Sequence, residues 1–235
     1  MKNLIAIPLL CGLLLGCDNK AEISQIEAAS NDALRAPDPF QALDKFDEQT
    51  GRYGRYCGQL LGDVLSYISS NQRAVCEKLL ATQTKIVVSA VDKGSLPALL
   101  FLLDSRQKNP PVYLKDLPAD YAIRQTAHLY ELASSLPTTK GNAELFSRAA
   151  MELQTGYSVM QDSEAAINLY KKAWQAGDQS AAVFMSDIYA FLGETRQAYF
   201  WSIRAHSFTK NANKLTRDEK IDIQRKAADA TITDI

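Results

Sequence analysis

Histidine is scarce in this chain, which has 235 residues but only two histidines, His128 and His206. Neither stands beside a nucleophile motif, and the chain has no G-x-S-x-G, H-E-x-x-H or phosphate-binding G-x-x-x-x-G-K sequence. His206 falls at the end of an expected helix, where a cation is favourable, and acid pairs such as Asp218 with Glu219 are typical of helix starts. We therefore predict a protein that is not an enzyme, with no catalytic residue, metal site, cofactor or small-molecule substrate.

A strong net charge is also absent, since 26 Lys and Arg residues face 27 Asp and Glu residues, which gives a net charge of −1. A chain so close to neutral does not suit nucleic acid or an anionic lipid surface as its main partner. The hydrophobic share of 46% and the charged share of 23% are those of an ordinary folded protein.

Residues 1–16 have the pattern of an export signal. Lys2 precedes an apolar run from Leu4 to Leu15, which Pro8 interrupts and which is too short to cross a hydrocarbon core of about 30 Å. The run ends in Leu14-Leu15-Gly16-Cys17, which resembles the lipobox of bacterial lipoproteins. The resemblance implies that residues 1–16 are removed and that Cys17 is lipidated.

The lipobox resemblance also implies a location. A lipidated Cys17 would anchor the chain in the bacterial cell envelope, facing the periplasm. Asp18 is similar to the signal that keeps lipoproteins in the inner membrane, and the outer membrane is the alternative. Residues 17–45 are rich in small and polar residues and contain a Pro37-Asp38-Pro39 turn. We expect this segment to be a tether, partly helical near 23–29.

Cysteine is sparse too: Cys11 leaves with the signal and Cys17 is lipidated, so Cys57 and Cys76 remain of the four. An exported pair favours a disulfide, and the alternatives are two independent buried thiols, or a metal or redox site without other ligands. Helices over 56–69 and 72–91 would leave the two cysteines about 12 Å apart along the helix axis. A bridge therefore requires an earlier turn, or Cys57 in a segment that folds back beside the hairpin.

One pattern is written twice between 141 and 206. Gly141 is followed at plus four, eight and twelve by Leu145, Ala149 and Leu153, and thirty-six residues later Gly177 is followed by Ala181, Met185 and Tyr189. Ala166, Leu169 and Ala173 recur as Ala198, Trp201 and Ala205, after a loop four residues shorter. Steps of three and four place side chains on one helical face, so each copy, 141–176 and 177–206, predicts a pair of helices.

This pattern, with its A-x-x-L/W-Y-x-x-A second helix, resembles the Sel1-like repeat, a relative of the tetratricopeptide repeat. The resemblance implies an all-α fold of stacked antiparallel helical hairpins, a solenoid that binds other molecules and has no active site common to the family. Gly94, Ala98 and Leu102 indicate a degenerate earlier copy over 94–134, which completes a repeat region over 94–206. An N-terminal helical hairpin is expected before it, over 46–93.

Two segments flank or interrupt the repeats. Three prolines within 109–118 exclude a continuous helix there, and this insertion is either a contact loop or a spacer that fills the groove between hairpins. Over 207–235 we expect a last helix that begins with a capping box at Thr216 and Glu219. A polar helix of this kind closes a solenoid, and recruitment of a partner is the alternative.

The partner-binding surface is predicted from the first helices of the copies, because these helices line the concave side of a solenoid. We select positions that the repeat signature does not use for packing: Arg106, Glu144, Arg148, Glu152, Phe184 and Asp187. Among them, Phe184 is an aromatic residue near acids and suits a binding hot spot. The alternative for Phe184 is packing beneath the neighbouring copy.

The leading functional hypothesis is a non-catalytic, membrane-anchored scaffold that binds another protein in the periplasm. Exported Sel1-like lipoproteins also resemble immunity proteins, which neutralise a secreted antibacterial toxin such as a phospholipase delivered by type VI secretion, and this is the alternative. A cell-envelope enzyme, the third class, would need a pocket with converging ionisable groups. We cannot assemble such a pocket from these residues.

Overall fold

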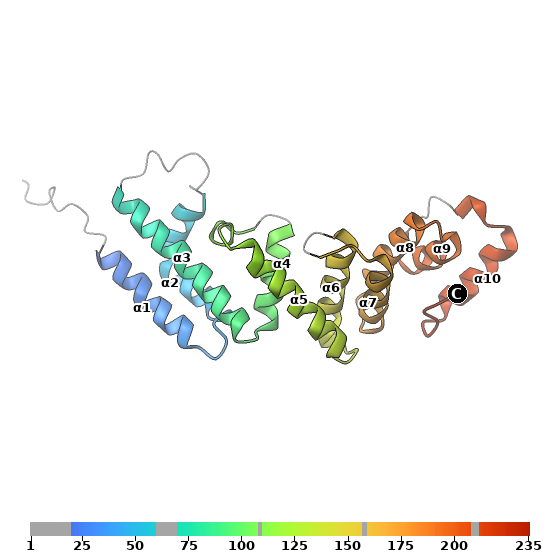
Figure 1. Ribbon diagram of the computed structural model, residues 1–235, viewed down its shortest axis with the longest axis horizontal. Helices are drawn as coiled ribbons and strands as arrows, with labels where there is room; N and C mark the ends of the chain where they lie inside the picture. The colour runs from blue at the N-terminus through green and yellow to red at the C-terminus, as the bar shows by residue number, and fades with distance from the viewer. Residues whose placement is uncertain (1–19, 60–69, 108–109, 157–158, 208–211) are drawn as a thin grey trace, which may run out of the picture. The chain divides into compact units, whose positions relative to one another are not determined.

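The computed structural model describes residues 20–59, 70–107, 110–156, 159–207 and 212–235. Regular structure in these residues is entirely helical, as expected, and helices that are neighbours in the chain contact one another (Figure 1). Contacts between Cα atoms divide the chain into unit 1, which ends at Asp116, and unit 2, which begins at Leu117. In the described part of the chain, no helix combines the length and the hydropathy needed to cross a membrane.

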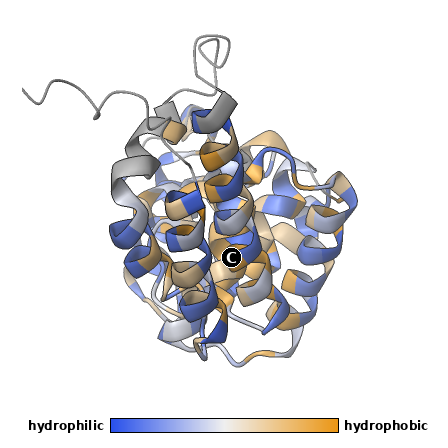
Figure 2. Cartoon of the chain, turned by 90° about the vertical axis from the view of Figure 1, so that its left-hand side faces the viewer, coloured by the Kyte–Doolittle hydropathy of each residue, from blue (hydrophilic) through white to orange (hydrophobic). Residues whose placement is uncertain are grey.

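Unit 1 is organised around its longest helix. Its elements are α1 (Lys20–Arg35), α2 (Leu43–Gln59), α3 (Ser70–Asp92), α4 (Leu96–Gln107) and the 3-10 helix η2 (Val112–Leu114). The other four elements all contact α3. The core includes the fully buried side chains of Phe46, Leu79, Ile86 and Leu102. Hydrophobic and hydrophilic residues are interspersed along the helices at this end of the chain (Figure 2).

The first helix, α1, is part of the folded unit. Ile26, Ala29 and Ala33 follow one another at steps of three and four, so they share a face, and all three are buried. α1 contacts both α2 and α3, and Lys93 Nζ caps its C-terminus by donating to Leu34 O at 2.9 Å. The expectation of a tether over 17–45 is therefore wrong for residues 20–35.

Cys57 and Cys76 lie together, with their Sγ atoms 2.05 Å apart and their Cα atoms 5.3 Å apart, as expected for a disulfide. The helix bounds explain why this is possible. The sequence suggested a helix from 56 to 69, of which residues 60–69 lie outside the described residues, and α2 covers Leu43–Gln59. Cys57 is therefore preceded by about four turns of helix and is not at a helix start, and with the Cα atoms 5.3 Å apart the expected 12 Å offset does not arise.

Unit 2 is a succession of helices in which each contacts the next. Its elements are α5 (Ala119–Ser135), the 3-10 helix η3 (Lys140–Asn142), α6 (Ala143–Thr155), α7 (Ser163–Gln175), α8 (Ala181–Phe191), α9 (Thr195–Arg204), the 3-10 helix η4 (Ala212–Lys214) and α10 (Arg217–Ala228). The pairs α6 with α7 and α8 with α9 make the most extensive contacts. They correspond to the two copies of the 36-residue pattern.

Equivalent positions of the two copies are buried alike. Leu145 and Ala149 in α6 are fully buried, as are Ala181 and Met185 in α8. The loop between α8 and α9 is also four residues shorter than the loop between α6 and α7, because residues 192–194 replace residues 156–162. The period in the sequence therefore matches a period in the packing.

The glycines that mark the two copies differ in conformation. Gly177 has φ of +103° and closes α7 in a Schellman motif, in which Asp178 N donates to Ala173 O at 2.9 Å. Gly141 instead lies in η3, and its φ is outside the left-handed region. His206 ends α9 in the same Schellman geometry as Gly177, with φ of +51°. The two glycines are thus equivalent in sequence position and not in backbone conformation.

The expected degenerate copy over 94–134 is divided between the units. Its first helix, α4, belongs to unit 1 and contacts α3, while its second helix, α5, belongs to unit 2 and contacts α6. The pairing of these two helices as one hairpin stays a prediction. Part of the insertion packs on α3 within unit 1, where Leu114 is buried and Thr84 Oγ1 donates to Tyr113 O.

The last helix, α10, begins with the expected capping box, in which Glu219 N donates to Thr216 Oγ1 at 3.3 Å. Arg204, at the end of α9, holds the other end of α10: its Nε donates to Ala227 O at 3.3 Å and its Nη2 donates to Asp229 O. Arg204 is only 7% exposed. Burial lowers the pKa of its guanidinium. Three ring centroids lie 4.3 to 5.3 Å from the guanidinium carbon of Arg204, those of Phe200, Trp201 and Trp174.

Candidate functional site

The residues predicted to bind a partner fall into different environments. Glu144 on α6 and Asp187 on α8 are exposed, so they remain available for contact. Glu152 is 1% exposed, which makes its prediction as a contact residue wrong. Arg148, one turn before Glu152, is half-buried, and its Nη1 lies 3.8 Å from Met151 Sδ. For Arg106, the structure describes the backbone of α4 and not the side chain.

Phe184 fits the packing alternative better than the hot-spot prediction. It is half-buried, and its ring stacks on Tyr170 of α7 with centroids 5.1 Å apart and an angle of 11° between the planes. Tyr170 in turn donates from its hydroxyl to Gln154 Oε1 on α6 at 2.8 Å. Burial raises the pKa of Tyr170 above its usual value. Phe184 therefore joins α8 to α7 through a neutral tyrosine.

Sequence reasoning missed a set of exposed apolar side chains on and beside α8. Val183 and Phe191 are two turns apart on the outer side of α8 and are 40% and 82% exposed, and Leu192, which follows, is 45% exposed. We call Phe191 and Leu192, which are adjacent at the end of α8, the α8 ridge. Met160 in the neighbouring loop is 89% exposed. The available signal was the apolar character of α8 at positions outside the repeat signature, since exposed apolar groups often mark binding surfaces.

Two hollows flank the end of this ridge. The smaller, of about 250 Å³, lies between the end of α6 and α8, and Gln154, Gln161, Asp187 and Phe191 contribute to its lining. The larger, of about 600 Å³, lies between α7 and α8, with Ile167, Lys171 and Leu192 in its wall. Asp187, which the sequence selected, thus lines the same hollow as Phe191, which the sequence did not select.

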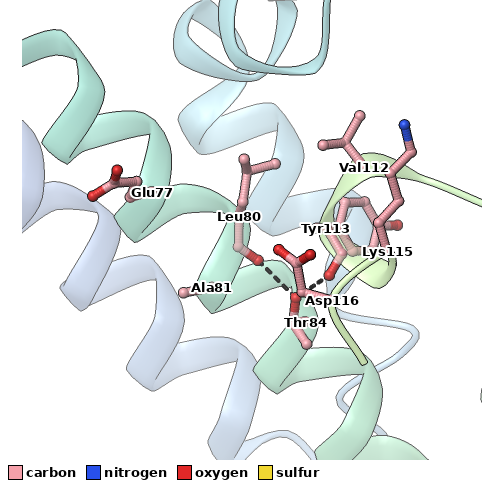
Figure 3. Close-up of a pocket in the computed structure, with 8 residues that line it drawn as sticks. All are labelled: Glu77, Leu80, Ala81, Thr84, Val112, Tyr113, Lys115 and Asp116. Carbon is pink, nitrogen blue, oxygen red and sulfur yellow. Dashed lines mark hydrogen bonds between the residues drawn. The ribbon is translucent and has the colours of Figure 1, made fainter. Parts of the chain in front are cut away.

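A third groove belongs to unit 1. It has a volume of about 590 Å³ and lies between α3, which contributes Glu77, Leu80 and Thr84, and the segment that contains Val112 and Tyr113 (Figure 3). The Thr84 hydroxyl bridges the carbonyl oxygens of Leu80 and Tyr113 and fastens the segment to α3. This groove offers a mixed apolar and polar wall.

One titratable cluster lies beside this groove. Gln83 Nε2 donates to Asp47 Oδ1 at 2.9 Å, and burial raises the pKa of that carboxyl. Burial, with a smaller contribution from the Asp47 charge, raises the pKa of Tyr113 to about 12, so its phenol is protonated at neutral pH. A protonated phenol can donate a hydrogen bond to a bound molecule, and it is a poor general base.

The described residues were compared with the needs of a metal site and of a catalytic histidine. No group of three or more His, Cys, Asp and Glu side chains among them is arranged to hold a metal ion. On α5, His128 Nδ1 lies 3.5 Å from Glu131 Oε2, and the two exposed side chains are one turn apart. His206 ends α9 and is exposed. The structure therefore gives neither histidine a nucleophile or ligand partner among these contacts.

Comparison of the chain with protein-family models, with curated proteins and with solved structures finds no match. The resemblance to Sel1-like repeats therefore remains a prediction from the sequence.

Proposed function

We propose that the chain is a lipid-anchored scaffold of the bacterial cell envelope, which binds another protein through unit 2 and catalyses no reaction of its own. The fold of unit 2 is interpreted as a short Sel1-like solenoid of helical hairpins. Support comes from the two copies of the 36-residue pattern, whose equivalent residues are buried alike in α6 and α8. Stacked units of this kind expose a long surface of consecutive helices, which suits macromolecular binding.

The observation that carries the proposal is the exposure of the α8 ridge. A phenylalanine that is 82% exposed adds little to the stability of the fold, yet it would remove a large apolar area from water on binding. Asp187 and the hollow of about 250 Å³ beside it supply the polar rim and the recess that surround an interface anchor.

The test is quantitative affinity capture of the full chain from its own cells, with Phe191→Ser as the variant. An aromatic anchor contributes about 2 kcal/mol or more, so we expect the affinity for the captured protein to fall roughly thirtyfold or more. Ile123→Ser on α5, where the isoleucine is 52% exposed, is the matched control and should leave capture unchanged. Equal capture by all three proteins would overturn the proposal. Recovery of a toxin would identify the immunity-protein alternative.

The anchor is tested separately, because Cys17 lies outside the described residues. Cys17→Ala should move the protein from the membrane fraction to the soluble fraction, since two or more acyl chains are needed for stable anchoring. Cys11→Ala, within the expected signal peptide, is the control. Sedimentation of Cys17→Ala with membranes would show that the lipobox prediction is wrong.

A further inference from the structure

The rim of the α8 ridge carries charge of one sign. Asp187 lines the smaller hollow beside Phe191, and Glu164 and Glu194 line the larger one beside Leu192. All three carboxylates are exposed. An apolar ridge with acids on both sides therefore faces solvent at this end of α8.

The cations of the same region are engaged within unit 2. Lys171, the basic residue in the wall of the larger hollow, has a side chain that is 17% exposed, and its Nζ lies 2.7 Å from Asp234 Oδ2. Arg196 on α9 pairs with Glu219 of α10 at 2.9 Å. These pairs balance the charge of Lys171 and Arg196 internally, and they leave the carboxylates of the rim to act on a binding partner.

We infer that the α8 ridge binds a basic amphipathic segment of another protein, one that carries an apolar side chain flanked by Lys or Arg. The inference rests on the proposed function and adds the chemistry of the partner. The apolar side chain would pack on Phe191, and a Lys or Arg beside it would place its charge at Asp187, which lines the same hollow. A second cation would meet Glu194 across the ridge.

The charge of the rim disfavours other occupants. Anionic lipid headgroups and nucleic acid have the same sign as the carboxylates, so their approach is repelled. A second copy of the chain that used this patch on both sides of a twofold axis would place acid against acid. A basic segment from a different protein suits both the apolar ridge and its rim.

The experiment places a photo-crosslinker on the ridge without removing Phe191. The full chain carrying p-benzoylphenylalanine in place of Leu192 is expressed in its own cells and irradiated, and the crosslinked peptides are sequenced by mass spectrometry. We expect crosslinks to a protein segment in which Lys or Arg alternates with apolar residues. Asp187→Lys should reduce the yield about tenfold, because it replaces an attraction by a repulsion. Asp32→Lys on α1, also exposed and with the same change in net charge, should leave the yield unchanged.

The outcomes separate this inference from the proposed function. Crosslinks to a neutral or acidic protein segment, or a yield that Asp187→Lys does not change, would overturn the basic partner and leave the scaffold intact. Crosslinks to lipid alone, to a second copy of this chain, or to nothing would overturn both.

Discussion

Arg204 offers the sharpest test of how unit 2 is held together. We predict that Arg204→Met destabilises unit 2 by about 2–3 kcal/mol. Methionine keeps an apolar side chain of similar reach but removes the donors to Ala227 O and Asp229 O, together with the guanidinium that lies over the rings of Trp174 and Phe200.

The magnitude follows from the two acceptors. A hydrogen bond to a charged donor contributes about 1.5–3 kcal/mol. Asp229 is exposed, so water can replace the donor at its carbonyl, whereas Ala227 is 9% exposed and its carbonyl loses a partner in a buried place. The removal of a desolvated charge offsets part of the loss. Arg204→Lys should recover less than half of the stability lost in Arg204→Met, because an ammonium cannot reach both carbonyls with the geometry of the guanidinium fork.

Urea unfolding followed by tryptophan fluorescence measures this effect, since the chain has two tryptophans, both in unit 2 and both beside Arg204. Arg196→Met is the matched control: Arg196 also joins α9 to α10, but through ion pairs with Glu219 and Asp222, in which all three side chains are more than a third exposed. Exposed pairs contribute about 1 kcal/mol or less. Equal losses for the two variants, or unchanged amide exchange of α10 in Arg204→Met, would refute the reasoning.

Three further predictions concern single interactions. Cys57→Ser should lower the free energy of unfolding of unit 1 by about 3 kcal/mol, because the disulfide closes a loop with a sequence separation of 19. Unfolding followed by circular dichroism, with and without reductant, measures this loss. If reductant also destabilised the variant, the disulfide assignment would be contradicted. His206→Gly should stabilise unit 2 by about 0.5–1 kcal/mol, because φ of +51° is strained for histidine. Gly177→Ala should destabilise unit 2 by about 1 kcal/mol, even though the added methyl group meets nothing within 4 Å. Urea unfolding measures both, and a gain in stability from the alanine would refute this reasoning. Tyr113 has a folded-state pKa of about 12 against an ordinary value of 10.0, so the unfolded chain loses this proton first and the stability that the phenol contributes is lost as pH rises from about 10 to about 12. Tyr113→Phe should flatten that part of the pH–stability curve, and curves of equal slope in the variant and the wild type would contradict the prediction.

The buried positions of the repeats were predictable, and the environment of polar residues was not. Small and apolar residues at steps of three and four identify Ala149 and Met185 as core from the sequence alone, because helical geometry fixes which residues share a face. The same rule does not predict that Glu152 and Arg204 are buried, since charged residues are seldom buried. Their burial depends on the helices packed against them, and a periodicity within one helix carries no information about those neighbours.

Unit 1 was harder to predict for a related reason. The apolar positions of α1 are few, and Ile26, Ala29 and Ala33 stand among polar residues, so the segment resembles a tether unless a partner helix is known. The start of α2 was missed in the same way: Phe46 and Thr50 are buried, yet the surrounding residues are charged. Missing the residues of α2 from Leu43 onward left Cys57 at the start of its expected helix, which created the apparent difficulty with the disulfide.

The stability of unit 2 and its proposed binding are separable, because different residues carry them. Trp201, Tyr170 and Ala198 are fully or almost fully buried, so any change there alters the packing of α9 and α7. Phe191 is 82% exposed, and a serine in its place should change the free energy of unfolding by no more than about 0.5 kcal/mol. A side chain that the fold does not need, held at the end of a well-packed helix beside a carboxylate, is free to serve recognition. If Phe191→Ser lowered stability as much as a core substitution does, the ridge would be part of the packing and the case for a docking surface would fail.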